Sequence, residues 1–335
     1  TGQAGEALKT LQTAMQRGLK TPAVDALLQK TEAALANIAT KGAAPTPAEI
    51  NQLAALFNAE RYAELENRGR ILVEQYPDNG VAWKALGLSL QVQGKDALSA
   101  LQKAAELLPG DAEAHYNFGN ALHNLGRLDD AVASYRRALA IKPGLAEAHY
   151  NFGITLRDLG QLDAAVASYR RALAIKPDFA DAHNNLGITL QALGQLDDAV
   201  ASYRRVLEIK PDFAEAYSNL GNALRDLGQF DDALASYRRA LAIKPDYADA
   251  HNNIGVALKS LGRFADAEDS FRQALTIKPD YAEAHNNWGI LLRDLGRFDD
   301  AVASYRRALA IKPDYAEAHS NLAMPCATSA NSMMR

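Results

Sequence analysis

Residues 180–213 read ADAHNNLGITLQALGQLDDAVASYRRVLEIKPDF, and this stretch decides the fold. In its first half, Leu186 and Leu190 belong to an apolar stripe at helical spacing. Gly194 ends that helix, because a glycine adopts a positive φ at little cost. The second half carries another apolar stripe, and Pro211 stops it. The stretch therefore predicts two short antiparallel helices joined by a tight turn.

The same pattern recurs every 34 residues in six copies that together span residues 112–315. The copies begin at Ala112, Ala146, Ala180, Ala214, Ala248 and Ala282. A period of this length indicates a stacked array of helix pairs rather than a globule with one core. In such arrays a long surface usually performs the function, and a catalytic pocket is uncommon.

The spacing within one copy also predicts how its helices begin and pack. Asp178 precedes the first helix and Asp181 follows three residues later, so we expect a capping box with aspartate in place of glutamate. Gly187 should leave room for a close helix crossing, and Tyr203 should fill the space beside it. We therefore expect Gly153→Leu or Ala165→Phe to overpack the same interface, at a cost of roughly 1–3 kcal/mol.

With these positions in place, the chain resembles the tetratricopeptide repeat (TPR) family. The family pattern asks for a large residue, Leu-Gly, a large residue, alanine, a large aromatic, alanine and proline. The copy at Ala112 supplies His115, Phe118, Gly119, Leu122, Ala131, Tyr135, Ala138 and Pro143. The resemblance implies an all-α fold: a right-handed TPR superhelix, or alpha solenoid, of stacked helix-turn-helix repeats with an N-terminal helical cap.

The pattern weakens toward both ends of the chain. We expect an N-terminal helical cap over 1–42, two degenerate units over 46–111, six regular repeats over 112–315 and the first helix of a seventh over 316–324. The unit that begins at Gly80 is two residues short after Gly94, so its second helix should be shifted or shorter. Degenerate end units are expected because an end repeat has one face in water.

The irregular tail at 325–335 is predicted to be a frameshift product. Read one base out of register, with permitted third bases, these residues become ALRDLGQLDDA, which nearly repeats 223–233. One base lost at the codon of Met324 would explain the change. The expectation is that the parental protein continues, that Pro325 ends the helix, and that the residues after it are disordered; the alternative is an unrelated natural tail.

Composition limits the function classes. The net charge is −4, which argues against a broad nucleic-acid surface, and no apolar run approaches the roughly 20 residues of a membrane helix. The only cysteine, Cys326, excludes an internal disulfide framework. No signal peptide opens the chain, so we expect a cytoplasmic protein, although a chain that begins with Thr1 gives this little weight.

Histidine occupies the first large position of most copies, and tyrosine replaces it once, at Tyr217. The members are His115, His149, His183, His251, His285 and His319. A metal ladder is one interpretation. We favour a packing position whose ring nitrogens bond locally, because equivalent residues one repeat apart are too distant to share an ion.

One polar residue is constant on the first helices. It is present as Asn117, Asn151, Asn185, Asn219, Asn253 and Asn287, with Asn321 in the seventh copy. An amide carries a donor and an acceptor, so it can bond the main chain of an extended peptide of any sequence. The row resembles the asparagine ladder in the TPR domain of O-linked N-acetylglucosamine transferases, and the repeats resemble those of SPINDLY-type bacterial proteins. The alternative is that the amide ties neighbouring helices or loops together.

Variable positions beside this row are predicted to set specificity. The first and second sets are represented by Tyr116, Tyr150, Asn120, Ile154, Ile188 and Asn222. A third set adds positive charge at Arg157, Arg225 and Arg293, which neighbouring aspartates balance in part. Such charges also occur on ordinary solvated faces, and that alternative remains open.

The leading hypothesis is an interaction scaffold that binds an extended peptide or partner segment in a concave groove. A second hypothesis is the substrate-targeting region of a larger glycosyltransferase-like enzyme, and a third is a self-assembling array that forms homo-oligomers through its exposed terminal repeat. No nucleophile–base constellation, metal spacing or phosphate loop stands out from the repeats. We therefore expect no enzyme activity, catalytic residue, metal, cofactor, nucleic-acid partner or membrane contact.

Overall fold

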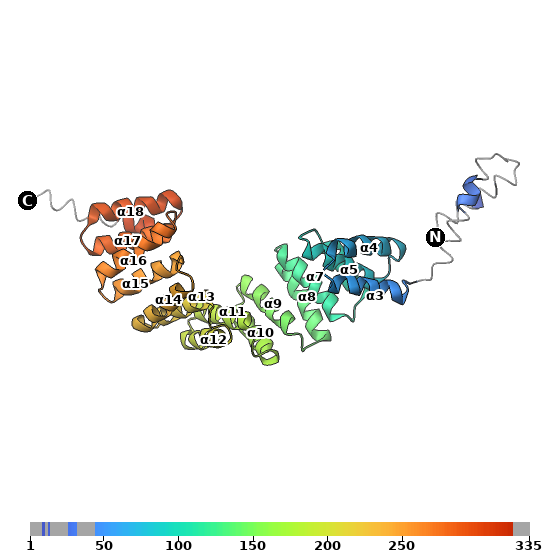
Figure 1. Ribbon diagram of the computed structural model, residues 1–335, viewed down its shortest axis with the longest axis horizontal. Helices are drawn as coiled ribbons and strands as arrows, with labels where there is room; N and C mark the ends of the chain where they lie inside the picture. The colour runs from blue at the N-terminus through green and yellow to red at the C-terminus, as the bar shows by residue number, and fades with distance from the viewer. Residues whose placement is uncertain (1–8, 11–12, 14–25, 32–43, 324–335) are drawn as a thin grey trace, which may run out of the picture. The chain divides into compact units, whose positions relative to one another are not determined.

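The computed structural model describes residues 9–10, 13, 26–31 and 44–323 (Figure 1). The chain divides into two compact units, the first ending at Pro143 and the second beginning at Gly144. Most of the cap predicted over 1–42, and the whole tail predicted over 325–335, lie outside the described residues. The two units are treated separately below.

Three helix pairs form the described part of the first unit. They are α3 (Pro47–Asn58) with α4 (Tyr62–Gln75), α5 (Gly80–Val92) with α6 (Leu98–Leu107), and α7 (Ala112–Asn124) with α8 (Leu128–Ile141). The pair α5–α6 is the one predicted to be irregular, and α6 has 10 residues where α8 has 14. The predicted shortening is therefore confirmed.

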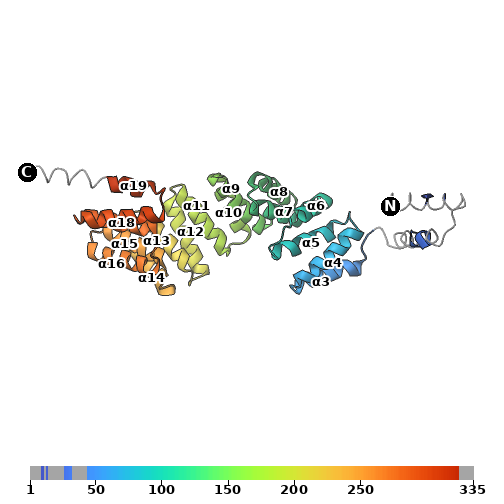
Figure 2. The same cartoon turned by 90° about the horizontal axis from the view of Figure 1, so that it is seen from above.

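Five helix pairs and one further helix form the described part of the second unit (Figure 2). The pairs are α9 (Ala146–Asp158) with α10 (Leu162–Ile175), α11 (Ala180–Ala192) with α12 (Leu196–Ile209), α13 (Ala214–Asp226) with α14 (Phe230–Ile243), α15 (Ala248–Ser260) with α16 (Phe264–Ile277), and α17 (Ala282–Asp294) with α18 (Phe298–Ile311); α19 (Ala316–Ala323) follows. Each helix packs on the next along the chain, and first helices also contact each other across neighbouring repeats. In both units the predicted all-α array of stacked helix pairs is confirmed, and no strand occurs among the described residues.

The turn inside each pair from α5–α6 onward closes on a glycine, as predicted, whereas the α3–α4 turn uses Glu60 at a φ of +56°. Gly194 has a φ of +73°, and the N–H of Gln195 donates to the carbonyl of Leu190 at 2.9 Å. This bond satisfies a carbonyl that the last turn of α11 would otherwise leave unpaired. Equivalent positive-φ glycines close the other regular repeats, so the turn is a fixed element of the array.

The predicted capping box at Asp178 is wrong. The residue at the start of α11 is Phe179, and no side chain caps that helix. Asp178 lies one residue too far upstream to reach the free N–H groups of the first turn, whereas Asp111 holds the cap position of α7 and accepts from two of them. The Phe179 ring instead packs 4.7 Å from the ring of Tyr150, so α11 begins with aromatic packing where α7 begins with a side-chain cap.

The core of each regular repeat is a glycine facing an aromatic ring. A Cβ atom added to Gly187 would lie 2.7 Å from Cε1 of Tyr203, which is 1% exposed. The same geometry joins Gly153 to Tyr169. Because interiors pack as densely as organic crystals, this contact sets how closely the two helices of a pair approach. The predicted roles of the small and the bulky residue are confirmed.

Candidate functional site

The asparagine row follows the first helices, and all its members except Asn117 lie in the second unit. We call the surface formed by Asn185, Asn219, Asn253 and Asn287 the asparagine face. These residues stand at equivalent positions of α11, α13, α15 and α17, and each is half-buried. The face is therefore made only of first helices, whose amides remain within reach of solvent.

The amide nitrogens of this row tie neighbouring first helices together. Nδ2 of Asn219 donates to Oδ1 of Asn184 at 3.1 Å, and Nδ2 of Asn287 donates to Oδ1 of Asn252 at 3.1 Å. Asn185 makes the corresponding bond to the hydroxyl of Tyr150 at 2.8 Å. One of the two predicted interpretations, an amide that joins helices, thus describes what the nitrogen atoms do.

The oxygen atoms of the row are used less evenly. Oδ1 of Asn185 accepts from Arg157 at 3.2 Å, and Oδ1 of Asn253 accepts from Asn252 at 3.3 Å. The described residues provide no hydrogen bond to Oδ1 of Asn219 or Asn287. An amide oxygen carries two lone pairs, so these two residues keep an acceptor for another molecule.

Asn253 departs from this pattern because its neighbour in the preceding repeat is Ser218, which is buried. Its Nδ2 donates instead to Oδ1 of Asn222 at 3.0 Å. The same oxygen accepts from the hydroxyl of Tyr237 at 2.8 Å. Asn222, predicted as a specificity position, is thereby joined both to the asparagine row and to the core of its own repeat.

The remaining predicted site residues, two of the asparagine row among them, lie on the first helices of their own units. In the first unit Tyr116, Asn117 and Asn120 are half-buried on α7. In the second unit the others lie on α9 and α11; they are Tyr150, Asn151, Ile154 and Ile188. Ile188 is 37% exposed and places an apolar side chain beside the row.

The positive charges of the third set are paired as predicted. Arg225 lies 3.0 Å from Asp226, and Arg293 lies 3.3 Å from Asp294. Lys259 also reaches Asp294, at 3.1 Å. Exposed pairs of this kind contribute little to stability, about 0–1 kcal/mol each, so their main effect is to hold the local charge near neutral.

An acidic row at the start of the first helices escaped the sequence analysis. Its members in the second unit include Glu215, Asp249, Glu283 and Glu317. Burial raises the pKa of Glu283, and the charges of Asp249 and Glu317 raise it further, while Arg225 and Lys278 oppose the shift. The row therefore places negative charge at the N-terminal end of each first helix, whereas Arg225 and Arg293 lie at the C-terminal end.

We expect Glu283→Gln to stabilise the second unit at pH 7 and to have little effect at pH 4. A glutamate whose pKa is raised by folding costs stability as the pH rises from its ordinary value of 4.5 through the raised folded value. The glutamine variant should lack this fall. Urea midpoints measured at both pH values test it, with Glu208→Gln as a control; a parent and an E283Q variant with the same pH profile would contradict it.

The histidine row bonds locally, as predicted. Nε2 of His183 lies 3.0 Å from the carbonyl of Pro177, and His285 lies 3.0 Å from that of Pro279. The contact repeats at His115, His251 and His319. Among the described residues, no group of three or more histidine, cysteine, aspartate or glutamate side chains could hold a metal ion.

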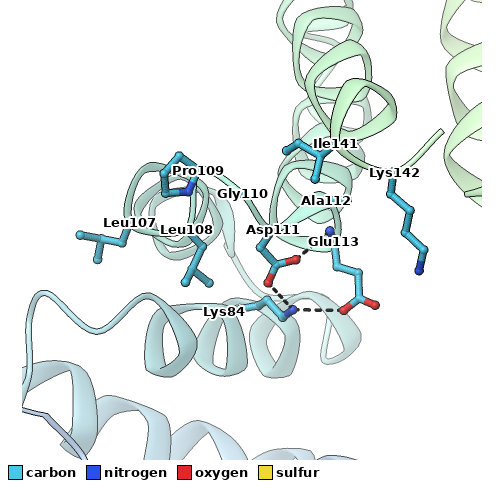
Figure 3. A pocket seen from close by; sticks show the side chains of 10 residues that line it. All are labelled: Lys84, Leu107, Leu108, Pro109, Gly110, Asp111, Ala112, Glu113, Ile141 and Lys142. Atoms are coloured by element: carbon cyan, nitrogen blue, oxygen red, sulfur yellow. Dashed lines mark hydrogen bonds and ion pairs between the residues drawn. The ribbon is translucent and has the colours of Figure 1, made fainter.

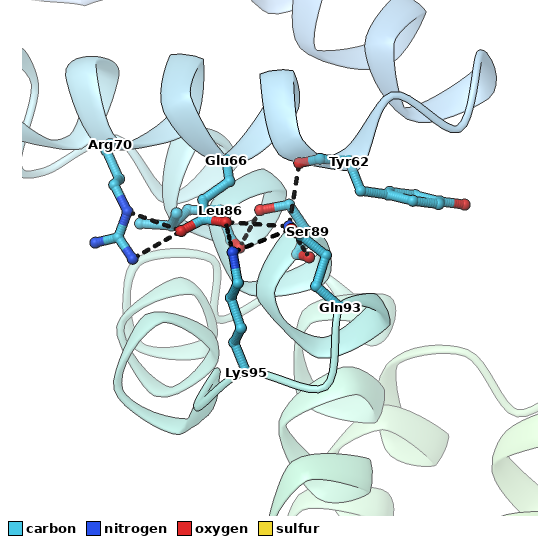
Figure 4. A network of polar contacts seen from close by, with 7 residues as sticks. All are labelled: Tyr62, Glu66, Arg70, Leu86, Ser89, Gln93 and Lys95. Atoms are coloured by element: carbon cyan, nitrogen blue, oxygen red, sulfur yellow. Dashed lines mark hydrogen bonds and ion pairs between the residues drawn. The ribbon is translucent and has the colours of Figure 1, made fainter.

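Two polar clusters and two pockets characterise the first unit. Lys84 bridges Asp111 at 2.7 Å and Glu113 at 3.1 Å beside an open pocket (Figure 3). Buried Glu66 accepts from Lys95 and Arg70, which together lower its pKa (Figure 4). A second pocket, of about 250 Å³, has an apolar lining that includes Ile50, Leu53, Phe57, Val81 and Leu88.

Sequence reasoning also missed the polar role of Tyr237, which was seen only as a packing residue. The missing signal was a spacing of 15 residues. Asn120 pairs with Tyr135 and Asn222 with Tyr237, whereas Val256 stands 15 residues before Phe271, which has no hydroxyl. In these three copies an asparagine is paired with a tyrosine, and a valine with a phenylalanine.

No helix in the described part of the chain has the length and apolar character needed to cross a membrane. A search of curated protein sequences finds no match. Several solved structures are similar in fold. MamA is 28% identical over 49% of this chain and 96% of its own, with a TM-score of 0.44. TTC0263, a thermophilic TPR protein in Thermus thermophilus, is 27% identical over 54% of this chain and 98% of its own, with a TM-score of 0.47.

A third solved structure is YrrB, described as a TPR protein with an unusual peptide-binding site. It is 22% identical over 56% of this chain and 96% of its own, with a TM-score of 0.44. The family model described as TPR repeat matches residues 119–156, 153–194, 190–225, 221–262 and 289–324. Models described as Tetratricopeptide repeat match residues 100–133 and 248–281. Together with the helix pairs of both units, these matches show that the chain belongs to the tetratricopeptide repeat family.

Proposed function

We propose that this protein is an interaction scaffold that holds an extended peptide, or an extended segment of a partner, along the asparagine face. TPR proteins serve as protein-interaction scaffolds and bind protein or peptide partners. The observation that carries the finer proposal is the pair of amide oxygens on Asn219 and Asn287, to which the described residues donate no hydrogen bond. These oxygens can accept from main-chain N–H groups, which every peptide residue except proline has.

Geometry and charge support an extended ligand. Packed helices lie about 8–10 Å apart and an extended chain rises roughly 3.3 Å per residue, so one row position would meet about every third peptide residue. Ile188 offers apolar contact beside the row, and the Arg225–Asp226 pair keeps its local charge balanced. Affinity would thus come from the main chain, and selectivity from the variable positions.

Alanine at both open positions tests the proposal. A 12-residue peptide is first selected from a random library on the full chain, and its affinity is then measured for Asn219→Ala/Asn287→Ala. We expect the affinity to fall at least about tenfold, since each lost bond to a buried main-chain N–H costs about 1 kcal/mol or more. The melting temperature should fall only modestly: both variant side chains are half-buried, and the main cost is that Oδ1 of buried Asn252 loses its donor.

The matched control is Asn184→Ala/Asn252→Ala. These changes remove the acceptors of the two ties and leave the oxygens of Asn219 and Asn287 in place. If this pair weakened peptide binding as much as Asn219→Ala/Asn287→Ala, the row would act only by joining helices. If the library yielded no enriched peptide, the proposed function itself would be wrong.

A second candidate function is the substrate-targeting region of a larger glycosyltransferase-like enzyme. The observation that favours it is the regular step of the row through Asn219, Asn253 and Asn287, which resembles the ladder of O-linked N-acetylglucosamine transferases. Sequencing the source locus across the codon of Met324 tests it. A downstream catalytic domain joined in frame by one restored base would support this role, and an in-frame stop with no such domain would exclude it.

A further inference from the structure

The ties between the first helices of the second unit donate toward the N-terminal end of the chain, and one bond within α15 links two of these ties into a series. Asn287 donates to Asn252 at 3.1 Å, Asn252 to Asn253 at 3.3 Å, and Asn253 to Asn222 at 3.0 Å. The series ends on Oδ1 of Asn222. Hydrogen bonds linked in this way polarise one another and strengthen the donor at the end of the series.

The Asn222 oxygen is saturated and the Asn222 nitrogen is open. Oδ1 accepts from the Tyr237 hydroxyl at 2.8 Å and from Asn253 at 3.0 Å, which uses both lone pairs. The described residues provide no acceptor for its Nδ2, and Nδ2 is not among their buried unpartnered atoms, so it is open to solvent. Since Tyr237 is fully buried, it holds this amide in one orientation.

We propose that Asn222 is the main-chain donor of the asparagine face, with Tyr237 as its positioning residue. Its ligand is the carbonyl of a peptide residue whose N–H is accepted by Asn219. This inference rests on the proposed function and goes beyond it, because it assigns the donor to a residue outside the constant row and fixes where along the face one peptide residue sits.

Asn219 and Asn222 have the spacing that such a pair requires. They stand three residues apart on α13, where side chains are neighbours at about 5–6 Å. Asn219 offers an open oxygen and Asn222 an open nitrogen. The N–H and C=O of one extended residue point to the same side, as they do toward a neighbouring strand, so the two amides can act as a substitute strand partner.

The other repeats of the second unit cannot supply this donor. The positions equivalent to Asn222 are held by Ile154, Ile188, Val256 and Ile290. An extended peptide that slides by one repeat would therefore keep its row contacts and lose this one. Asn222 thereby fixes the register of the peptide on the second unit.

The test is Asn222→Val/Tyr237→Phe, a double variant that copies the pair Val256 and Phe271 already present in this array. It should fold like the parent by circular dichroism, although Nδ2 of Asn253 loses its acceptor, and bind the library-selected 12-residue peptide about fivefold more weakly, the loss expected for one missing main-chain bond. Tyr305→Phe is the matched control, because its hydroxyl is equally buried and has no partner. It should leave the affinity unchanged.

A scan of single backbone esters in the peptide identifies the peptide residue that Asn222 contacts. Each ester removes one N–H and weakens the carbonyl of the preceding residue. The ester that weakens the carbonyl bound by Asn222 should lower the affinity for the parent and should not change the affinity for the double variant. Equal affinity of the parent and the double variant would overturn this inference, while loss of binding in Asn219→Ala/Asn287→Ala would leave the proposed function standing. An unfolded double variant would contradict the claim that the two pairs are interchangeable.

Discussion

Replacing Gly153 by leucine is expected to destabilise the second unit by about 1–3 kcal/mol. A Cβ atom at this position would already lie 2.6 Å from Cε1 of Tyr169, a separation that real Cβ atoms do not show. Leucine also raises helix propensity relative to glycine by up to ~1 kcal/mol, so the measured loss is what remains after that gain. The urea midpoint of the full chain should fall accordingly.

Two companion variants make the result specific. Gly144→Leu is the control, because a Cβ atom there meets nothing within 4 Å, and its midpoint should stay near that of the parent. Gly153→Ala/Tyr169→Leu should recover part of the loss, since the smaller side chain retreats from the contact. If Gly153→Leu had the same urea midpoint as the parent, the assignment of this glycine as the point where the two helices cross would be wrong.

Truncating Tyr305 to alanine is expected to cost about 3–5 kcal/mol, the range for large aromatic side chains removed from a core. Tyr305 is 0% exposed and lies in the cluster that contains Leu292 and Ala301. Removing the ring would leave a cavity that the backbones of α17 and α18 cannot close without losing their own contacts. No other single change discussed for this unit should have a larger effect.

Tyr305→Phe separates the ring from its hydroxyl. Burial raises the pKa of Tyr305, and its hydroxyl has no hydrogen-bond partner among the described residues. Because an unsatisfied buried polar group costs about 1–3 kcal/mol, phenylalanine should match or exceed the stability of the parent. Trp288 packs beside this cluster and reports its unfolding by fluorescence once Trp83, the only other tryptophan, is replaced by phenylalanine. A stable alanine variant would contradict the cavity argument.

The helices of this protein could be predicted from its sequence because the same helical pattern occurs in six copies. Apolar spacing, the turn glycine at Gly194 and the stop at Pro211 are local signals, and the structure follows them. The cap at Asp178 could not be predicted correctly, because it depended on a one-residue placement that the ring of Phe179 decides by packing against Tyr150.

The candidate site was predictable only as a set of positions. The sequence shows that Asn219 and Asn222 share a helix face, but the rotation of each repeat on the next determines which neighbour an amide meets. That rotation depends on packing between repeats, such as the cluster that joins Val206 of α12 to Ala216 of α13. The direction of the amide bonds and the shifted pKa of Glu283 within the acidic row therefore emerge only from the structure.

The ties between first helices also restrict how such an array can grow by duplication. Asn253 relies on Asn222 because Ser218 occupies the place that Asn184 and Asn252 hold for other repeats. A copy of the repeat at Ala248 inserted after a repeat with neither asparagine would leave its amide nitrogen unpaired. Repeats that look interchangeable in sequence thus depend on which repeat precedes them. Selection on recombined genes would therefore act on the contacts between neighbouring repeats as well as on the core of each repeat.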